Sequence, residues 1–274
     1  MLPRMKVTAA IAAGTATALL AAGCSIGLQA SGPPSPAQEV ALAASQARQA
    51  SSFAAGLSVT MSGAVSETIA GTMQIRSQPS LLAAADFGTV DLAGHIVPGG
   101  LQEILTNQTV YLRMKVLSQQ LHKPWAEIQF SALRQGTGVS LGQLTQQVQA
   151  SSPLVQTQML AAAKNVRVVG RQVIGGVRTT QYAGSYTAAA GVAALPPGLR
   201  AAEETGMQAL GIQVVSFNAW IDAQHQTRKI VVSENGSTEQ VRVRLQVTSI
   251  NRAVSVSLPP AGQVAALPPI AVGG

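Results

Sequence analysis

The sequence predicts an α+β protein built around one large antiparallel sheet, with helices inserted between groups of strands. Many short segments alternate apolar and polar residues, which is the period of half-buried strands. Glycine-containing turns join several of these segments in pairs, as expected for β-hairpins. A few stretches change to the spacing of a helix, and they are grouped rather than placed after every strand. That arrangement favours α+β over a regularly alternating α/β architecture.

The composition excludes several classes of protein. The chain has 274 residues, of which 47% are hydrophobic and 11% charged. An intrinsically disordered chain or a charged coiled coil requires more charge and less apolar surface. Aromatic residues make up only 3% of the chain, and the net charge of +7 is scattered along it. We therefore expect no nucleic-acid partner, because single-strand binders need aromatic platforms and a dense basic groove.

The first 23 residues have the pattern of an export signal. Arg4 and Lys6 precede an uncharged stretch, 7–22, that is rich in alanine, leucine and threonine. A membrane-spanning helix needs about 20 apolar residues, so this stretch is too short to be one. A positive start, an apolar middle and small residues at the end are typical of a secretory signal peptide.

The end of this signal resembles the lipobox of bacterial lipoproteins. It reads Leu19-Leu20-Ala21-Ala22-Gly23-Cys24, although leucine is the commonest residue at the place of Ala21. The resemblance implies that residues 1–23 are removed and that Cys24 is acylated. Cys24 is the only cysteine, so it cannot form an internal disulfide in an exported protein. The alternative is an ordinary signal peptide with a free thiol.

An acylated Cys24 would anchor the protein on the extracytoplasmic face of the cytoplasmic membrane. Two acyl chains hold firmly, because each buried CH₂ contributes about 0.8 kcal/mol. Residues 24–36 contain Gly32-Pro33-Pro34-Ser35-Pro36 and are predicted to be a tether. About 12 such residues reach at most roughly 40 Å. We predict a single domain over residues 37–274.

The first half of that domain begins with a helix and continues with strands. The pattern from Ala37 to about Ser51 is helical. Leu57, Val59 and Met61 then alternate with polar residues, and a second alternating run ends at Ile75. Gly63 lies between the two runs, which predicts a hairpin. Further strands are expected at 81–90, 94–97, 110–114 and 126–130.

The second half returns to strands after a helical interval. Residues 141–148 and a segment opened by Pro153 have helical spacing. Strands at 166–174 and 177–186 are joined by Gly175-Gly176, a pair suited to the positive φ of a two-residue hairpin turn. A helix is expected from Pro197 to about Leu210. The last strands lie at 215–221, 229–233 and 241–247, and the final one should point Arg242 and Arg244 outward and Val243 and Leu245 inward.

No catalytic or metal-binding pattern survives inspection. Residues 138–142 match G-x-S-x-G around Ser140, but no strand precedes them as a nucleophile elbow requires. Asp222 and His225 could supply the acid and the histidine of a triad, yet they are only three residues apart. The three histidines are isolated from one another and from the cysteine, which gives no metal-ligand spacing. We therefore predict a protein that is not an enzyme and has no metal or cofactor.

A series of short motifs resembles the LppX/LprG-type lipoproteins of high-GC Gram-positive bacteria, which share the LolA-like fold. The resemblance covers roughly residues 37–260, and its motifs punctuate the structure rather than carry chemistry. The motifs are Tyr111-Leu112-Arg113, Lys123-Pro124-Trp125, Val173 to Gly184 with Tyr182-Ala183-Gly184 at its end, Ala219-Trp220-Ile221-Asp222 and Arg228-Lys229-Ile230.

This resemblance implies a half-barrel, in which a curved antiparallel sheet carries helices over its concave face. In the family, acyl chains of lipids or lipoglycans lie between sheet and helices and are carried across the envelope, so an envelope transporter is a candidate partner. Methionine would suit such a lining because its thioether repacks easily, whereas each position could instead belong to a filled core. The candidate lipid-binding residues are Leu57, Val59, Met61, Met73, Ile75, Leu112, Met114, Ile128, Phe130, Phe217, Val243 and Leu245.

Two other functions compete with lipid binding. The same fold could serve as an envelope sensor or scaffold, with its groove closed and another protein as its partner. A solute-binding protein of a transporter would need two α/β lobes built from βαβ units, and the sequence contains no such units.

Overall fold

A computed structural model describes residues 33–63, 66–131 and 157–267 of the chain. The residues from Pro34 onward form one compact unit. Cys24, Ser140 and the helix expected at 141–148 lie outside the described residues, and so does Pro153.

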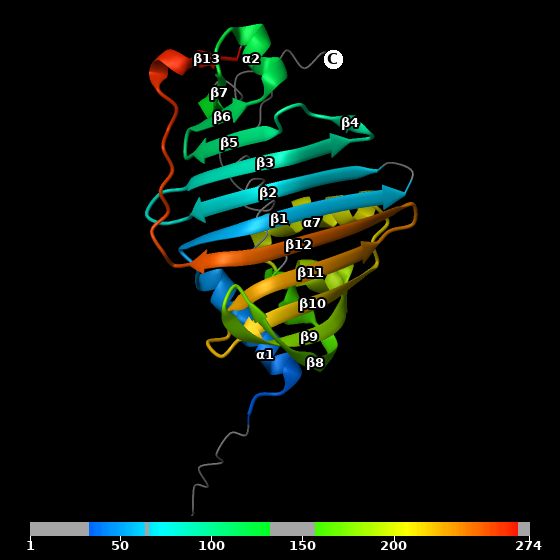
Figure 1. The fold of residues 1–274 in the computed structure, drawn as a ribbon. Coiled ribbons are helices and arrows are strands. Elements are labelled where there is room, and N and C mark those ends of the chain that lie inside the picture. Colours follow the sequence, from blue (N-terminus) through cyan, green and yellow to red (C-terminus); the bar gives the residue numbers. More distant parts are fainter. Residues whose placement is uncertain (1–32, 64–65, 132–156, 268–274) are drawn as a thin grey trace, which may run out of the picture. The chain divides into compact units, whose positions relative to one another are not determined.

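The described strands form one open antiparallel sheet, with a single parallel pair between β13 and β7 at one end (Figure 1). The order across the sheet is β13-β7-β6-β5-β3-β2-β1-β12-β11-β10-β9-β8, and β4 pairs with β3. The predicted α+β fold with a large curved, unclosed sheet is confirmed. The strands are β1 (Ser52–Gly63), β2 (Glu67–Arg76), β3 (Leu82–Leu92), β4 (His95–Ile96), β5 (Leu101–Thr106), β6 (Thr109–Arg113), β7 (Trp125–Gln129), β8 (Lys164–Ile174), β9 (Val177–Thr187), β10 (Val214–Asp222), β11 (Thr227–Asn235), β12 (Glu239–Ile250) and β13 (Val264–Ala266).

The helices that cover the sheet gather over one end of it. α1 packs against β8 and β10, and α6 packs against β9 and α7 (Figure 1). α2 lies beside β7 at the other end. No helix among the described residues is long and apolar enough to cross a membrane. The helices are α1 (Pro36–Gln49), α2 (Lys115–Leu121), α6 (Ala188–Ala193) and α7 (Pro197–Ala209), with 3₁₀ turns η1 (Leu160–Ala162) and η2 (Ala261–Gln263).

The helix predicted from Ala37 is α1, and its start is fixed by a capping box. The Ser35 hydroxyl accepts a hydrogen bond from the Gln38 N–H, and the Gln38 side chain accepts one from the Ser35 N–H at 2.8 Å. Two backbone donors that the first turn leaves unpaired are thereby satisfied. Pro36 stands at the first helical position, where its missing N–H costs nothing.

The two faces of the sheet differ along every long strand. On β12, Arg242 and Arg244 are exposed, whereas Leu245 is buried and Val243 packs against the core. The predicted orientation of this strand is therefore confirmed. Leu57 of β1 stands opposite Leu245, so the same face continues across the neighbouring strand. We call the side that faces α1, α6 and α7 the inner face and the opposite side the outer face.

The hairpin predicted at Gly175-Gly176 joins β8 to β9. Both glycines have positive φ, +56° and +82°. Ile174 stands opposite Val177, so the loop has two residues. Because a side chain would be strained at both positions, the glycine pair sets the register of this hairpin.

Several short elements differ from the sequence prediction, and β13 is one that was not predicted. β5 was not predicted, because the polar Glu103 interrupts its alternation of Leu101 and Leu105. The strand expected at 110–114 ends at Arg113, and Met114 is instead the N-cap residue of the unpredicted α2. The Ser118 N–H and hydroxyl both bond the Met114 carbonyl, which turns the chain into a helix where continued alternation was expected. α6 was also missed, since its six residues are too few to show a helical period.

Candidate functional site

The inner face of β8–β12, which we call the helix-packed half, is a filled core. Phe217 and Leu245 expose only 2% and 1% of their surface, and residues of α1 and α7 complete the same cluster. Leu57 and Val243 are partly buried against it. Met73 and Ile75 of β2 also pack against it, so six predicted lining residues contact or belong to this core.

The inner face of β2–β7, which we call the distal half, is largely apolar and unevenly covered. Leu105 and Ala126 expose only 2% and 1% of their surface, whereas other positions are half-buried. Met73, Ile75, Leu112 and Ile128 lie there, each with part of its surface accessible. The register aligns Met73 with Ala85 and, two strands further, with Leu112. A second row joins Ile75 to Ala83, Leu105, Val110 and Ile128.

Small alanines thus alternate with long apolar side chains across the strands of the distal half. The sequence analysis identified the residues at the two ends of each row. It missed the β5 residues in the middle, because β5 had not been recognised as a strand. Leu105 is the inner-face residue that a correct β5 would have added, whereas Ala83 and Val110 lie on strands that were predicted but were not named as candidates.

The remaining predicted residues lie at the edges of this face. Val59 and Met61 continue the inner face along β1, opposite Val243 and Val241, and both are half-buried. Phe130 is buried just beyond the end of β7. Met114 is half-buried at the start of α2 rather than on a strand. The structure therefore places Val59, Met61 and the four distal residues on the same, mostly apolar, face of the sheet.

One carboxylate interrupts that surface. Glu103 stands in the inner row between Ala85 and Leu112. Burial among these neighbours raises the pKa of the Glu103 side chain. The site therefore has a single ionisable group in the middle of its apolar row, which sequence analysis did not identify.

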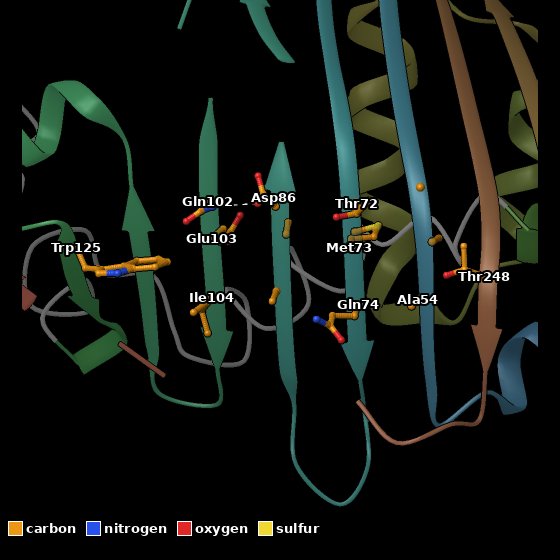
Figure 2. A pocket seen from close by; sticks show the side chains of 14 residues that line it. Ala54, Thr72, Met73, Gln74, Asp86, Gln102, Glu103, Ile104, Trp125 and Thr248 are labelled. Carbon is orange, nitrogen blue, oxygen red and sulfur yellow. Dashed lines mark hydrogen bonds between the residues drawn. The ribbon is translucent and has the colours of Figure 1, made fainter. Parts of the chain in front are cut away.

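A hollow of about 420 Å³ lies across β12, β1, β2, β3 and β5 and reaches Trp125 (Figure 2). Thr72, Asp86 and Gln102 are register neighbours along it, and Gln102 Nε2 donates to Asp86 Oδ2 at 2.9 Å. The guanidinium carbon of Arg113 lies 6.0 Å from the centre of the Trp125 ring. These side chains belong to the outer face, because each alternates with an inner-face residue. The lining of this hollow mixes polar and apolar residues. It includes Met73, Ala85 and Glu103 of the inner row, so the hollow is not separate from the predicted lipid-binding residues.

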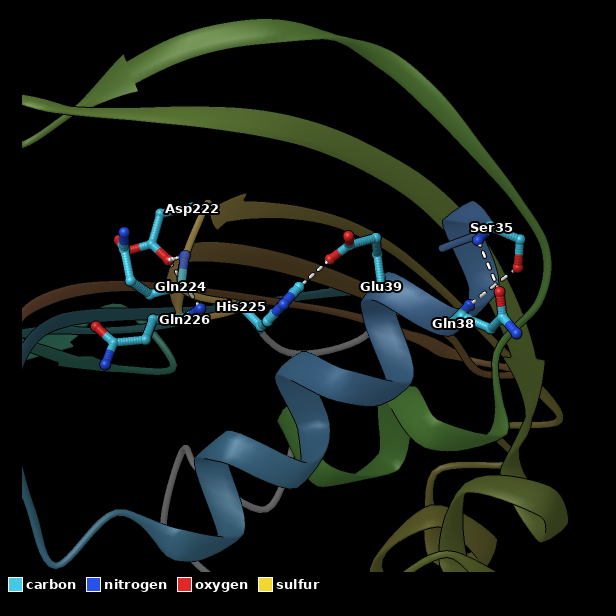
Figure 3. A network of polar contacts seen from close by, with 7 residues as sticks. All are labelled: Ser35, Gln38, Glu39, Asp222, Gln224, His225 and Gln226. Carbon is cyan, nitrogen blue, oxygen red and sulfur yellow. Dashed lines mark hydrogen bonds and ion pairs between the residues drawn. The ribbon is translucent and has the colours of Figure 1, made fainter. Parts of the chain in front are cut away.

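Another hollow, of about 660 Å³, lies between α1, the β8–β9 hairpin and the turn from β10 to β11. His225 Nδ1 and Glu39 Oε2 are 2.7 Å apart, which ties this turn to the first turn of α1 (Figure 3). Asp222 Oδ1 accepts the Gln224 and Gln226 N–H groups, and Arg228 Nε donates to Asp222 Oδ2 at 2.7 Å.

The acid and the histidine weighed for a hydrolase thus have separate partners. Asp222 shapes a turn and binds Arg228, whereas His225 binds Glu39. Within the described ranges, no group of three or more acidic, histidine or cysteine side chains is placed to hold a metal ion.

No protein-family model matches the chain. No curated protein matches it either. Solved structures do match over most of the chain. LprF from Mycobacterium bovis aligns over 83% of this chain and 99% of its own length, with 12% identity and a TM-score of 0.51. The fold is of the LppX/LprG type.

Two further structures of this LolA-like group align more loosely. The lipoprotein LppX of Mycobacterium tuberculosis shares 16% identity over 81% of this chain and 98% of its own, with a TM-score of 0.43. A LolA superfamily protein from Nitrosomonas europaea shares 9% over 81% and 96%, with a TM-score of 0.28. At these identities and TM-scores, neither structure says anything about the ligand of this chain.

The motifs that resemble the LppX/LprG type have identifiable structural roles here. Gly184 pairs with Phe217, and a Cβ at Gly184 would lie 2.8 Å from the Phe217 ring, so only glycine leaves room for that ring. Trp220 packs on the outer face beneath Lys229, whose Nζ is 4.3 Å from the ring centre. Lys123 Nζ donates to the Gly262 carbonyl at 2.6 Å, which ties the start of β7 to the turn before β13. The motifs therefore specify packing and turns.

Proposed function

We propose that the protein is a membrane-anchored, non-enzymatic lipoprotein that binds the acyl chains of lipids or lipoglycans on the distal half of its inner face. In this role it carries them within the cell envelope. The observation that carries the proposal is the mostly apolar inner face on which six half-buried side chains lie, namely Val59, Met61, Met73, Ile75, Leu112 and Ile128.

The energetics of this surface suit acyl chains. Each CH₂ transferred from water to an apolar surface contributes about 0.8 kcal/mol, so a chain needs length rather than specific polar contacts. The small side chains of Ala83 and Ala85 leave shallow depressions in the surface between the longer side chains of β2, β5 and β6. Methionines 61 and 73 can change rotamer to follow chains of different shape.

The anchor completes the proposal. Residues 1–23 would be removed as a signal peptide, and acyl chains on Cys24 would hold the domain to the extracytoplasmic face of the cytoplasmic membrane through residues 24–36. Residues 37–274 would act as one lipid-binding domain, with an envelope transporter as a partner that delivers or receives the lipid.

Replacing Cys24 by alanine tests the anchor. We expect Cys24→Ala either to remain unprocessed or to be released from membranes, as judged by fractionation and by the mass of the product. Retention of a cleaved Cys24→Ala protein in the membrane fraction would contradict acylation at this residue.

Native mass spectrometry of the protein purified from its own host tests lipid binding directly. We expect adducts with the mass of acyl lipids, which organic extraction should remove and identify. Leu112→Trp should reduce these adducts, because its bulk would fill the distal surface. Phe217→Leu is a suitable control, since Phe217 lies in the filled core.

The alternative is an envelope sensor or scaffold that binds another protein. The hollow along Thr72, Asp86 and Gln102 favours this alternative, because a recess of mixed polar and apolar lining beside Trp125 resembles the amphipathic surfaces found in protein interfaces. A host-purified protein without acyl adducts, whose partner is lost in Trp125→Ala, would support this alternative.

A further inference from the structure

The β8–β9 hairpin carries charge of one sign only. Its charged residues are Lys164, Arg167, Arg171 and Arg178, and residues 164–187 contain no aspartate or glutamate. All four are exposed. Within the described ranges neither Arg171 nor Arg178 forms an ion pair, because the two ion pairs found there are His225–Glu39 and Arg228–Asp222. The hairpin is thus a cationic element with arginines free to bind an anion.

The same hairpin also exposes apolar side chains. Val168, Val169 and Val173 are 54%, 50% and 59% exposed, although β-branched residues usually pack against a neighbour. The register places Val173 opposite Arg178 and Arg171 opposite Thr180. Thr180 in turn stands opposite Ile221, an inner-face residue. Basic and apolar side chains are therefore interleaved on the inner side of the edge strand β8.

Arg171 and Arg178 also line the hollow of about 660 Å³ described above. The other charged or titratable groups along it are Glu39, Asp222, His225 and Tyr182. Glu39 is hydrogen-bonded to His225 and Asp222 is paired with Arg228, so both carboxylates already have partners. The hollow is large enough for the polar headgroup of a lipid.

The position of α1 in the chain relates this hairpin to the membrane. Glu39, in the first turn of α1, lies on the wall of the hollow (Figure 3). α1 begins at Pro36, about 12 residues after Cys24, which allows a reach of at most roughly 40 Å. A domain anchored at Cys24 would keep the start of α1, and the hairpin in contact with it, close to the bilayer.

We propose that the β8–β9 hairpin docks on an anionic bilayer surface. Arg171 and Arg178 bind headgroup phosphates, and Val168 and Val173 enter the interface between headgroups and acyl chains. Arginine suits this role because its planar guanidinium binds phosphate oxygens in pairs. The hairpin would hold the domain in one orientation on the membrane, a role that uses the anchor of the proposed function but not its lipid-binding surface.

Vesicle flotation tests this docking without the anchor. The probe protein is the chain from residue 24 with Cys24→Ser, after its cooperative unfolding has been verified. The vesicles are phosphatidylcholine alone or with 30–40% phosphatidylglycerol (roughly the anionic content of a bacterial membrane). We expect binding to the anionic vesicles only, and weaker binding as the salt concentration rises, because surface charges are screened.

Matched variants separate the hairpin from general charge. Each cation near an anionic surface contributes a factor of about five in affinity, so Arg171→Glu with Arg178→Glu should reduce flotation at least 25-fold. Arg242→Glu with Arg244→Glu makes the same change on exposed arginines of β12 and should reduce flotation several-fold less. Val168→Ser with Val173→Ser should also weaken binding while preserving its salt dependence.

Two results would overturn the docking proposal. One is equal loss of flotation in the β8–β9 and β12 arginine variants, which would indicate net charge alone. The other is binding to phosphatidylcholine that equals binding to the anionic vesicles. Uptake of a fluorescent fatty acid by the same Arg171→Glu/Arg178→Glu protein should stay at the wild-type level, so a failure of docking is distinguishable from a failure of the acyl site.

Discussion

The two halves of the sheet use the same strand pattern and reach different packing. In the helix-packed half, Phe217 and Leu245 are almost completely buried under α1 and α7. In the distal half, Leu112 and Ile128 occupy equivalent inner positions and remain half-buried. Alternation therefore decides which face is apolar, and the helices decide whether that face becomes a solid core. Apolar side chains remain partly accessible where strands extend beyond the packed helices.

Truncating one leucine in each half should give the largest difference. Leu245→Ala removes a side chain with 1% exposure, which should lower the free energy of unfolding by about 2–5 kcal/mol. Leu112→Ala should cost less than half as much, because its side chain already lacks neighbours on one side. Denaturant unfolding of both variants measures this. Equal losses would show that the distal half is packed as tightly as the core.

Enlarging a side chain should also affect the two halves differently, by straining the packed half and by blocking the accessible one. Leu245→Trp should destabilise the protein by about 1–3 kcal/mol or more, since a packed core strains when side chains are enlarged. Ile128→Trp should change stability little but should reduce uptake of a fluorescent acyl probe. Thermal unfolding and probe titration of the two variants give both values. A destabilised Ile128→Trp protein whose wild type takes up no probe would favour the sensor or scaffold function.

Two glycines provide a finer comparison of the same kind. At Gly184 a Cβ would approach the Phe217 ring to 2.8 Å, so Gly184→Ala should cost about 1–2 kcal/mol through displacement of that ring. At Gly88, on β3 of the distal half, a Cβ would meet nothing within 4 Å. Gly88→Ala should therefore leave the urea midpoint almost unchanged. A larger effect at Gly88 than at Gly184 would contradict the packing of both halves.

Much of this fold could be predicted because alternation and turn chemistry are local signals. Gly175-Gly176 and the strict alternation of β12 each depend on a few neighbouring residues, and both were assigned correctly. β5 was missed because Glu103 breaks its apolar pattern, and the register across three strands is what places that carboxylate among apolar neighbours. Such a register is a tertiary property that one strand does not encode.

The site was harder to predict than the fold for a related reason. Phe217 and Met73 have the same pattern in sequence, an apolar residue flanked by polar or small ones, yet one is sealed and the other is partly accessible. The difference arises from packing by elements that are distant in sequence, such as α1 against β10, the strand that carries Phe217. The predicted strand position of Met114 was wrong for a local reason. The Ser118 hydroxyl donates to the Met114 carbonyl at the start of a helix, which the alternating pattern does not reveal.

The smallest predicted effect concerns the pH dependence that Glu103 gives to the distal half. Burial raises the pKa of Glu103, so the folded protein holds this proton more tightly than the unfolded chain does. Below the ordinary glutamate range both states are protonated and the carboxyl carries no penalty. As pH rises from that range through the raised pKa, the unfolded chain ionises first and the folded state loses relative stability. Glu103→Gln should remove this loss.

Unfolding midpoints of wild type and Glu103→Gln between pH 4 and pH 8 measure the effect. The two proteins should be nearly equal at the acidic end, and Glu103→Gln should become the more stable one as pH rises. Glu204→Gln, on an exposed position of α7, controls for the loss of one negative charge. If an acyl chain covers Glu103, the neutral side chain should also strengthen uptake of the acyl probe at pH 7. Parallel pH profiles for wild type and Glu103→Gln, together with unchanged uptake, would mean that water still solvates this carboxylate. The distal half would then be too wet to hold an acyl chain at its centre.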